Sequence, residues 1–193
     1  VVNVKNSDGL VFIYSNFVNY GGTSLVKEVL LANGFSMYGS SNKNPKIVVL
    51  DYSVSTSKKS RIIKKFNGDD NINGDIIKII IGSPSLSEGI TLKNVNQIHI
   101  LEPYWNLSRI DQVIGRARRI ESHKELPEDQ RNVTVYEYVS RFTDEQKNGD
   151  WEKNEKYKNN RAFLSAFSWI GNVVQGSIGY PKSKPTYACD GFV

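Results

Sequence analysis

The stretch WNLSRIDQVIGRARRIESH (105–123) combines a glutamine, a glycine and closely spaced arginines in an apolar rhythm of helical period. This period predicts a helix that places Gln112, Arg116 and Arg119 on one polar face. Two guanidinium groups one turn apart can hold the oxygens of a single phosphate group from two directions. Gly115 removes a side chain beside this face, so a ligand or another backbone can come close. A solvent-facing basic helix is the alternative interpretation.

A second stretch, IIIGSPSLSEGITLKNV (79–95), runs from an apolar strand pattern into glycine and hydroxyl residues. In an open α/β sheet, ligands bind at the carboxyl ends of the strands, which is where we expect this loop. Hydroxyl groups and free backbone amides there suit phosphate oxygens. An ordinary Gly/Ser connection is the alternative.

Alternating strand and helix patterns surround these two stretches. The predicted strands, rich in β-branched and aromatic residues, are 10–15, 46–51, 75–82, 96–102 and 132–139, and the predicted helices are 23–34, 55–68 and 106–119. The alternation predicts an α/β fold over residues 1–140, with a mainly parallel sheet covered by helices on both faces. Residues 141–193 are expected to form a polar linker and a C-terminal extension of unknown role. Within that extension, 161–174 is amphipathic and 176–191 is expected to be irregular.

The composition limits the class of protein. A net charge of +5 over 193 residues permits a polyanionic partner without establishing one. The single cysteine, Cys189, excludes a disulfide within the chain and favours a reducing compartment. No apolar run approaches the ~20 residues of a membrane helix, so we expect a soluble protein without a membrane partner. The chain starts at Val1 without a secretory signal pattern, and we expect it to be a piece of a longer protein.

Three motifs in order carry a resemblance to a known family. QVIGRARR (112–119) closely resembles motif VI of superfamily 2 helicases, the pattern Q-x-x-G-R-x-x-R. SPSLSEGITL (83–92) resembles their motif V, and VFIYSNF (11–17) resembles their motif IV. The order and spacing are similar to those of the second, C-terminal RecA-like domain of these enzymes. The segment 115–139, with its SH…LP…R.V pattern, looks most like the nucleoside triphosphatase I and early-transcription-factor helicases of large nucleocytoplasmic DNA viruses. The chromatin-remodeller branch is the nearest alternative.

The resemblance implies roles for the matched residues. Arg116 and Arg119 match the arginines that approach the γ-phosphate of the nucleotide, and Gln112 matches the glutamine that helps to position that end of the site. Further nucleotide-binding positions are then expected at Glu88, Gly89, Thr91 and Gly115, and nucleic-acid-binding positions at Ser15, Asn16 and Ser83; no metal ligand is expected. Thr91 stands where many relatives have Asp or Asn, and it could bond a ribose or a neighbouring arginine. Arg118 stands where many helicases have glycine.

The first half of such a motor has no counterpart in the sequence. The chain contains neither a G-x-x-x-x-G-K-[ST] pattern nor a DExH pattern. The resemblance therefore implies that ATP and Mg²⁺ are bound mainly by an N-terminal RecA-like domain outside this chain. The complete protein would be an ATP-dependent helicase, whereas this piece alone would be inactive. The alternative is a non-catalytic RecA-like binding or scaffold module of a viral transcription complex.

The same resemblance implies partners and a place. DNA or RNA, the N-terminal RecA-like domain and a viral RNA polymerase are the expected partners. The host cytoplasm, within a viral factory, or the virion is the expected location. The lysines of the predicted helix 55–68 form a basic face, which is solvated by default, with contact to nucleic acid as the alternative.

Overall fold

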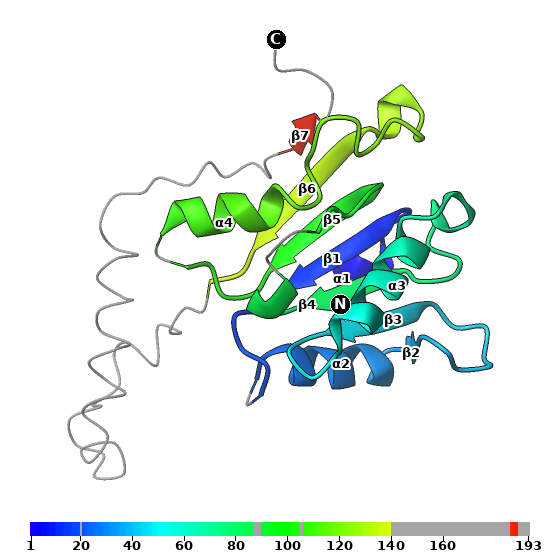
Figure 1. Ribbon diagram of the computed structural model, residues 1–193, viewed down its shortest axis with the longest axis vertical. Helices are drawn as coiled ribbons and strands as arrows, with labels where there is room; N and C mark the ends of the chain where they lie inside the picture. The colour runs from blue at the N-terminus through cyan, green and yellow to red at the C-terminus, as the bar shows by residue number, and fades with distance from the viewer. Residues whose placement is uncertain (20, 87–89, 105, 140–185, 189–193) are drawn as a thin grey trace. The chain divides into compact units, whose positions relative to one another are not determined.

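The computed structural model describes residues 1–19, 21–86, 90–104, 106–139 and 186–188. The chain divides into two compact units, and the first, residues 1–138 with 184–193, contains the sheet. The strand order is β2-β3-β4-β1-β5-β6-β7 (Figure 1), with β1 (Leu10–Tyr14), β2 (Ser36–Met37), β3 (Lys46–Leu50), β4 (Ile79–Gly82), β5 (Val95–Ile100), β6 (Asn132–Glu137) and β7 (Thr186–Ala188). Neighbouring strands from β2 to β6 are parallel, and β7 pairs antiparallel with β6.

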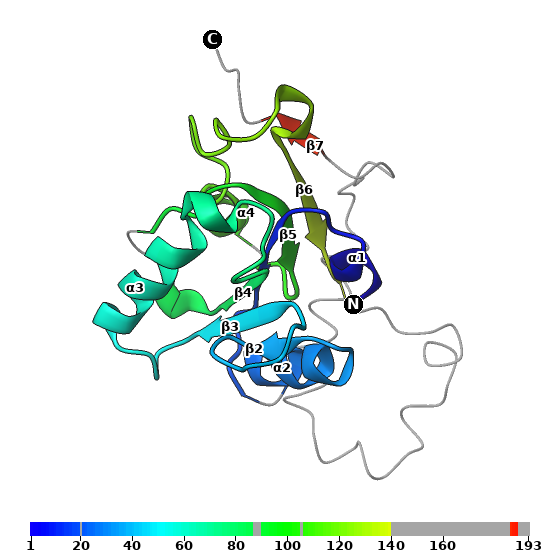
Figure 2. The same cartoon turned by 90° about the vertical axis from the view of Figure 1, so that its right-hand side faces the viewer.

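Helices cover both faces of the sheet, as predicted from the alternation of patterns. They are α1 (Val2–Lys5), α2 (Thr23–Ala32), α3 (Thr56–Phe66) and α4 (Leu107–Ile114), with 3-10 turns at 69–71, 84–86 and 128–130. Side chains of β1 alternate between the faces: Phe12 packs in one apolar core with Phe66 of α3 and Ile110 of α4. Ile13 packs in a second core with Leu30 of α2, while α1 contributes to the same side (Figure 2).

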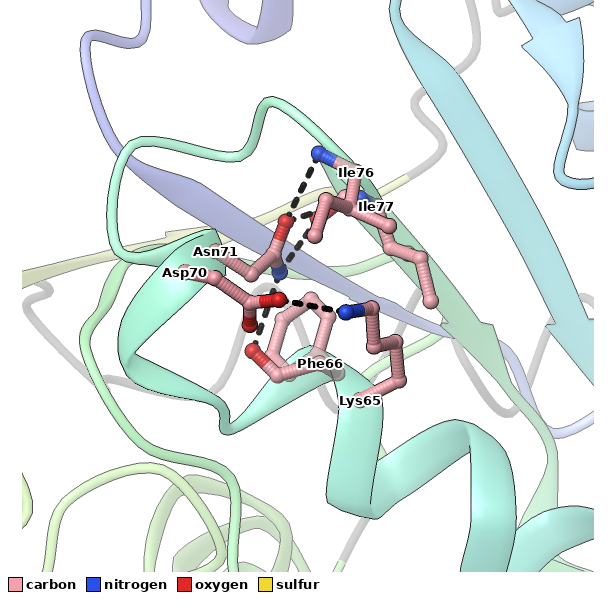
Figure 3. Close-up of polar contacts among 6 residues, drawn as sticks. All are labelled: Lys65, Phe66, Asp70, Asn71, Ile76 and Ile77. Carbon is pink, nitrogen blue, oxygen red and sulfur yellow. Dashed lines mark hydrogen bonds and ion pairs between the residues drawn. The ribbon is translucent and has the colours of Figure 1, made fainter.

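One predicted strand is shorter than its apolar run. The pattern predicts a strand from 75, yet β4 begins at Ile79. The side chain of Asn71 explains the difference, because its Oδ1 accepts from the amides of Ile76 at 2.9 Å and Ile77 at 2.8 Å (Figure 3). Its Nδ2 donates to the carbonyls of Phe66 and Ile77. A buried asparagine therefore supplies the hydrogen bonds that a neighbouring strand would otherwise supply.

The predicted helix 106–119 is also shorter, and this corrects the placement of the arginines. Asn106 caps the start of α4 by accepting from the amide of Ser108, but the helix ends at Ile114. The carbonyl of Arg116 accepts from the amide of Leu92 at 2.8 Å instead of from a following helical turn. The carbonyl of Ala117 lies 3.1 Å from Oγ of Ser122. Tertiary bonds thus replace helical ones, so Arg116 and Arg119 lie in turns beyond α4 and do not share a continuous helix face with Gln112.

The C-terminal region adds an element that the sequence pattern does not predict. Residues 186–188 form β7 although the Gly- and Pro-punctuated stretch 176–191 is expected to be irregular. The amphipathic stretch 161–174 lies outside the described residues. Within the part of the chain that the structure describes, no helix is long and apolar enough to cross a membrane.

Candidate functional site

Two segments meet beside the amino-terminal end of β5, and they carry the predicted arginines. The segment 90–95 leads into β5, and the segment 115–125 follows α4. The amide of Leu92 donates to the carbonyl of Arg116, and the amide of Asn94 donates to the carbonyl of Ser122 at 2.9 Å. Residues predicted from separate motifs are thereby brought together. We call Thr91, Arg116 and Arg119 the arginine cluster.

Arg119 is held by neutral oxygen atoms in this cluster. Its Nη1 donates to Oγ1 of Thr91 at 2.5 Å, and its Nε donates to the carbonyl of Gly115 at 3.3 Å. Of the two partners that the sequence left open for Thr91, the structure shows the neighbouring arginine. A guanidinium presents several donors, so these contacts leave it able to donate to a further acceptor.

Arg116 carries an unsatisfied donor. Its side chain is partly buried, and Nε is fully buried without a hydrogen-bond partner. Leaving a buried donor unsatisfied costs about 1–3 kcal/mol, and more for a charged group. An anionic oxygen is the acceptor that a guanidinium binds best, and phosphate oxygens match its geometry. Because Nε is closed to solvent, an anion can reach it only after the Arg116 side chain moves.

Gln112 and Gly115 flank the arginine cluster. Gln112 is exposed on the last turn of α4. A Cβ added to Gly115 would meet only the carbonyl oxygens of Asp111, at 3.1 Å, and Gln112, at 3.7 Å. The glycine thus accommodates no other close segment here, which leaves the side beside it open to a ligand.

A second group of predicted residues lies at the carboxyl ends of the strands. They are Ser15, Asn16 and Ser83, and together with Glu102, which was not predicted, we call them the carboxyl-end cluster. Oγ of Ser15 contacts the backbone of Phe17, and Ser15 is 0 % exposed while Ser83 is 1 % exposed. Nδ2 of Asn16 donates to the carbonyl of Glu102 at 2.9 Å, and the amide of Asn16 donates to the Glu102 carboxylate at 3.0 Å. These groups join the end of β1 to the end of β5 and are occupied within the domain.

Accessible polar groups next to the carboxyl-end cluster were missed as site residues. Ser85 is exposed, and its hydroxyl lies 3.0 Å from that of Ser83. Nζ of Lys59 on α3 donates to Oγ of Ser85 at 3.2 Å. The lysine-rich face of helix 55–68 was the available signal, but its pairing with the Ser85 loop is tertiary. Glu88 and Gly89 lie outside the described residues.

Polar side chains fix the segment that precedes β5. Asn67, at the end of α3, donates to the carbonyl of Thr91 and accepts from the amide of Lys93, both at 2.8 Å. Glu125 accepts from Nδ2 of Asn94 at 3.0 Å and from Nζ of Lys93 at 3.2 Å. The hydrogen bond from Asn94, with help from Lys93, lowers the pKa of the Glu125 carboxyl below its ordinary value. The segment is therefore bonded on both sides.

The described residues contain no group of three or more His, Cys, Asp or Glu side chains that could hold a metal ion. The two described histidines are instead buried and hydrogen-bonded. His99 of β5 contacts the hydroxyl of Tyr138 at 2.7 Å and Oε1 of Gln97 at 3.1 Å. Burial lowers the pKa of His99 to about 4. His99 is thus neutral at neutral pH.

Comparison with known proteins places this geometry in context. The profile of the family described as "Helicase conserved C-terminal domain" matches residues 1–121. An ATP-dependent RNA helicase predicted in Acanthamoeba polyphaga mimivirus is 38% identical over 138 residues, which are 71% of this chain and 24% of that protein. Nucleoside triphosphatase I of Melanoplus sanguinipes entomopoxvirus is 33% identical over 186 residues, which are 96% of this chain and 26% of that protein. The chain therefore spans about a quarter of the length of these relatives.

A solved structure shares the fold. The C-terminal part of the Fun30 ATPase domain matches with a TM-score of 0.54 at 22% identity, covering 72% of this chain and 37% of that chain. The likeness agrees with the parallel sheet covered on both faces. The solved structure thus supports the fold, while the family profile and the viral relatives confirm the resemblance that the three sequence motifs indicated.

Proposed function

The chain belongs to the helicase conserved C-terminal domain family, and from that premise we propose that it is the second motor domain of an ATP-dependent nucleic-acid helicase or translocase. In this proposal, Arg116 and Arg119 complete the nucleotide site of an adjoining RecA-like domain that binds ATP and Mg²⁺. Gln112, Gly115 and Thr91 border that site, together with Glu88 and Gly89. A role in viral transcription, with a viral RNA polymerase as partner in the virion or the host cytoplasm, is part of the same proposal.

The observation that carries this proposal is that the motif V segment and the turn after α4 meet, which brings Arg116 and Arg119 together beside Thr91. In phosphoryl transfer, charge spreads over the oxygens of the transferred group, and arginines stabilise that charge. In this proposal the Arg116 side chain moves when the domains close around ATP, because Nε is shut off from solvent in the domain alone. Its donors would then face the oxygens of the γ-phosphate as water attacks the phosphorus and ADP leaves. Catalysis requires that the arginines interact more strongly with the transition state than with bound ATP, and the charge that spreads over the transferred group provides this difference.

Nucleic acid would bind on the side of the carboxyl-end cluster. We propose that Lys59 and Ser85 make the accessible phosphate contacts, because Ser83 and Ser15 are buried and Asn16 is bonded to Glu102. Ser83, Ser15 and Asn16 would then contribute indirectly, by holding the loops in the conformation that presents Lys59 and Ser85 to the phosphates. Contacts to phosphates predict binding that is sensitive to salt and nearly independent of sequence.

Closure of the two domains around ATP would couple these regions. ATP would bring Arg116 and Arg119 against the γ-phosphate, and hydrolysis would reopen the cleft. Ser83 of the carboxyl-end cluster and Thr91 of the arginine cluster are close in the sequence, so movement at one cluster would change the grip on the strand at the other. Each cycle would then advance the protein along the nucleic acid.

Replacement of Arg116 in the full-length protein tests the proposal. We expect Arg116→Ala to abolish nucleic-acid-stimulated ATP hydrolysis while nucleic-acid binding is retained. Arg61→Ala, which removes an exposed arginine of α3, is the charge-matched control and should keep wild-type turnover. Unchanged hydrolysis in Arg116→Ala would refute the motor and favour a non-catalytic binding module.

A second experiment concerns the piece itself. We expect purified 1–193 to show no ATP hydrolysis with added DNA or RNA, because arginines without the phosphate- and Mg²⁺-binding half stabilise no transition state. Turnover that disappears in Arg116→Ala would show instead that this chain contains a complete site.

A further inference from the structure

Two adjacent polar side chains beyond the arginine cluster are completely enclosed. Ser122 is 3 % exposed and His123 is 0 % exposed. Burying such groups is costly unless they are hydrogen-bonded. Both are bonded, and the bonds lead from the backbone of Arg119 to the sheet.

The bonds form a continuous chain. The amide of Arg119 donates to Oγ of Ser122 at 3.2 Å, and this Oγ lies 2.7 Å from Nδ1 of His123. Nε2 of His123 lies 2.8 Å from the carbonyl of Val95, the first residue of β5. Since a carbonyl only accepts, Nε2 carries a proton. The one hydroxyl proton of Ser122 is shared between the carbonyl of Ala117, at 3.1 Å, and Nδ1 of His123. Hydrogen bonds arranged in such a chain polarise and strengthen one another.

The backbone at this place holds conformations that need support. The amide of Ser122 donates to the carbonyl of Arg119 at 3.0 Å, which closes a turn in which Glu121 has φ of 61°. Asn94, whose amide donates to the carbonyl of Ser122, has φ of 56°. Left-handed conformations of this kind are uncommon for residues other than glycine and persist where surrounding bonds over-determine them.

We propose that Ser122 and His123 are positioning residues, which fix the turn bearing Arg119 to β5 so that its guanidinium is preorganised for the phosphate. Neither side chain reaches solvent, so neither touches a ligand; both act through Arg119. This inference rests on the proposed function. It adds that Ser122 and His123 hold the backbone of Arg119 in the position that the function requires. Loss of the anchor would misplace Arg119, and a misplacement of about 1 Å can reduce turnover about 100-fold.

The test measures ATP hydrolysis by the full-length protein. His123→Phe keeps a ring but removes both hydrogen bonds, and we expect kcat to fall about 10- to 100-fold with little change in the KM for ATP. Ser122→Ala should reduce kcat in the same way. Ser122→Thr keeps the hydroxyl, so its kcat should stay close to that of the wild-type protein. The matched control is His99→Phe, another buried histidine bonded through both ring nitrogens but lying in β5. It should lower the melting temperature without lowering kcat.

The outcomes are separable from those of the proposed function. If the wild-type protein hydrolyses ATP and Arg116→Ala abolishes this, but Ser122→Ala and His123→Phe keep wild-type kcat, only the positioning inference is overturned. It is also overturned if His99→Phe lowers kcat as much as His123→Phe does. A wild-type protein without ATP hydrolysis overturns both. Amide exchange of the wild-type protein gives an independent check: the Arg119 amide should exchange slowly although its side chain is exposed, and fast exchange would contradict the anchor.

Discussion

The carboxyl-end cluster and the arginine cluster both contain polar residues at positions that the sequence marks as functional, but they use their polar atoms differently. In the carboxyl-end cluster, Asn16 and Glu102 bond to each other, and Ser15 and Ser83 are buried. In the arginine cluster, Nε of Arg116 is buried without a partner, and Arg119 rests on Thr91. Satisfied groups hold a fold together, whereas a buried donor without a partner needs an explanation, and at a pair of arginines a bound anion is one. We therefore assign the carboxyl-end cluster a structural role and the arginine cluster a direct role in ATP hydrolysis.

The largest effect should come from the arginine cluster. Arg116→Lys in the full-length protein keeps the charge but loses the planar fork, and we expect kcat for ATP to fall about 10³-fold. Ser83→Ala, in the carboxyl-end cluster, should keep kcat close to wild type. Steady-state ATPase assays at saturating nucleic acid measure both. A larger loss in Ser83→Ala than in Arg116→Lys would reverse the comparison.

Acid should affect the sheet before it affects the bonds that fix the segment before β5. Burial lowers the pKa of His99 to about 4, against an ordinary value of 6.5, so unfolding takes up a proton between these pH values. The contribution of neutral His99 to the free energy of unfolding is therefore fully present above pH 6.5. It falls as the pH drops towards 4, by up to about 3 kcal/mol. Glu125 has a lowered pKa, so its contribution is present above its ordinary pKa of 4.5 and is lost only below it. Urea unfolding from pH 7 to pH 4 measures this slope, which His99→Phe should flatten; an unchanged slope in that variant would assign it to other groups.

Removing a member of the carboxyl-end cluster should reduce stability and spare catalysis. Asn16→Ala removes the donor to the Glu102 carbonyl and the acceptor of the Tyr14 hydroxyl. We expect a loss of about 1–3 kcal/mol in the free energy of unfolding, with kcat unchanged below the melting temperature. Asn19→Ala, in the same loop at an exposed position, is the control and should be nearly neutral. If Asn16→Ala lowers kcat without lowering the free energy of unfolding, Asn16 takes part in ATP hydrolysis and its role is not only structural.

The sequence predicted the elements well where burial is encoded locally. Apolar runs located β1, β3 and β4, and the helices predicted at 23–34 and 55–68 match α2 and α3 to within two residues at their ends. It failed where distant groups compete for backbone bonds. The amide of Leu92 takes the carbonyl of Arg116, 24 positions away, and ends α4 early, while Asn71 takes the amides that would have extended β4.

In the candidate site, too, the sequence predicted what is encoded locally and missed what depends on tertiary contacts. The arginines are recognisable because their type and spacing express their chemistry. The burial of the Ser83 hydroxyl and the approach of Lys59 to Ser85 depend on packing between α3 and a loop, which no local pattern contains. The Ser-His pair after the arginines was visible as a discriminating part of the resemblance. Its bonds to the Arg119 amide and to β5 were not, because they require the tertiary turn.

A smaller effect should follow from removing the lysine beside the carboxyl-end cluster. If Lys59 contacts a backbone phosphate, Lys59→Ala should weaken nucleic-acid binding similarly for all sequences and reduce the salt slope by about 1. Lys64→Ala, an exposed lysine further along α3, loses the same charge and should keep the wild-type slope. Fluorescence anisotropy across a salt series measures both slopes, and equal slopes would assign Lys59 to the general basic field of the helix.

The smallest effect should come from replacing Thr91. It tests whether Arg119 must break its hydrogen bond to Thr91 before it binds the γ-phosphate. The hydroxyl of Thr91 holds Arg119 in the structure without nucleotide, and in the proposed cycle the arginine must leave it for the γ-phosphate. Thr91→Val removes this competing acceptor, so the affinity of the full-length protein for ATP should rise by up to about fivefold, the equivalent of roughly 1 kcal/mol. Thr91→Ser keeps the acceptor and should match wild type. If Thr91→Val binds ATP more weakly than Thr91→Ser, the contact belongs to the nucleotide-bound state, and Arg119 is already in its working position before ATP arrives.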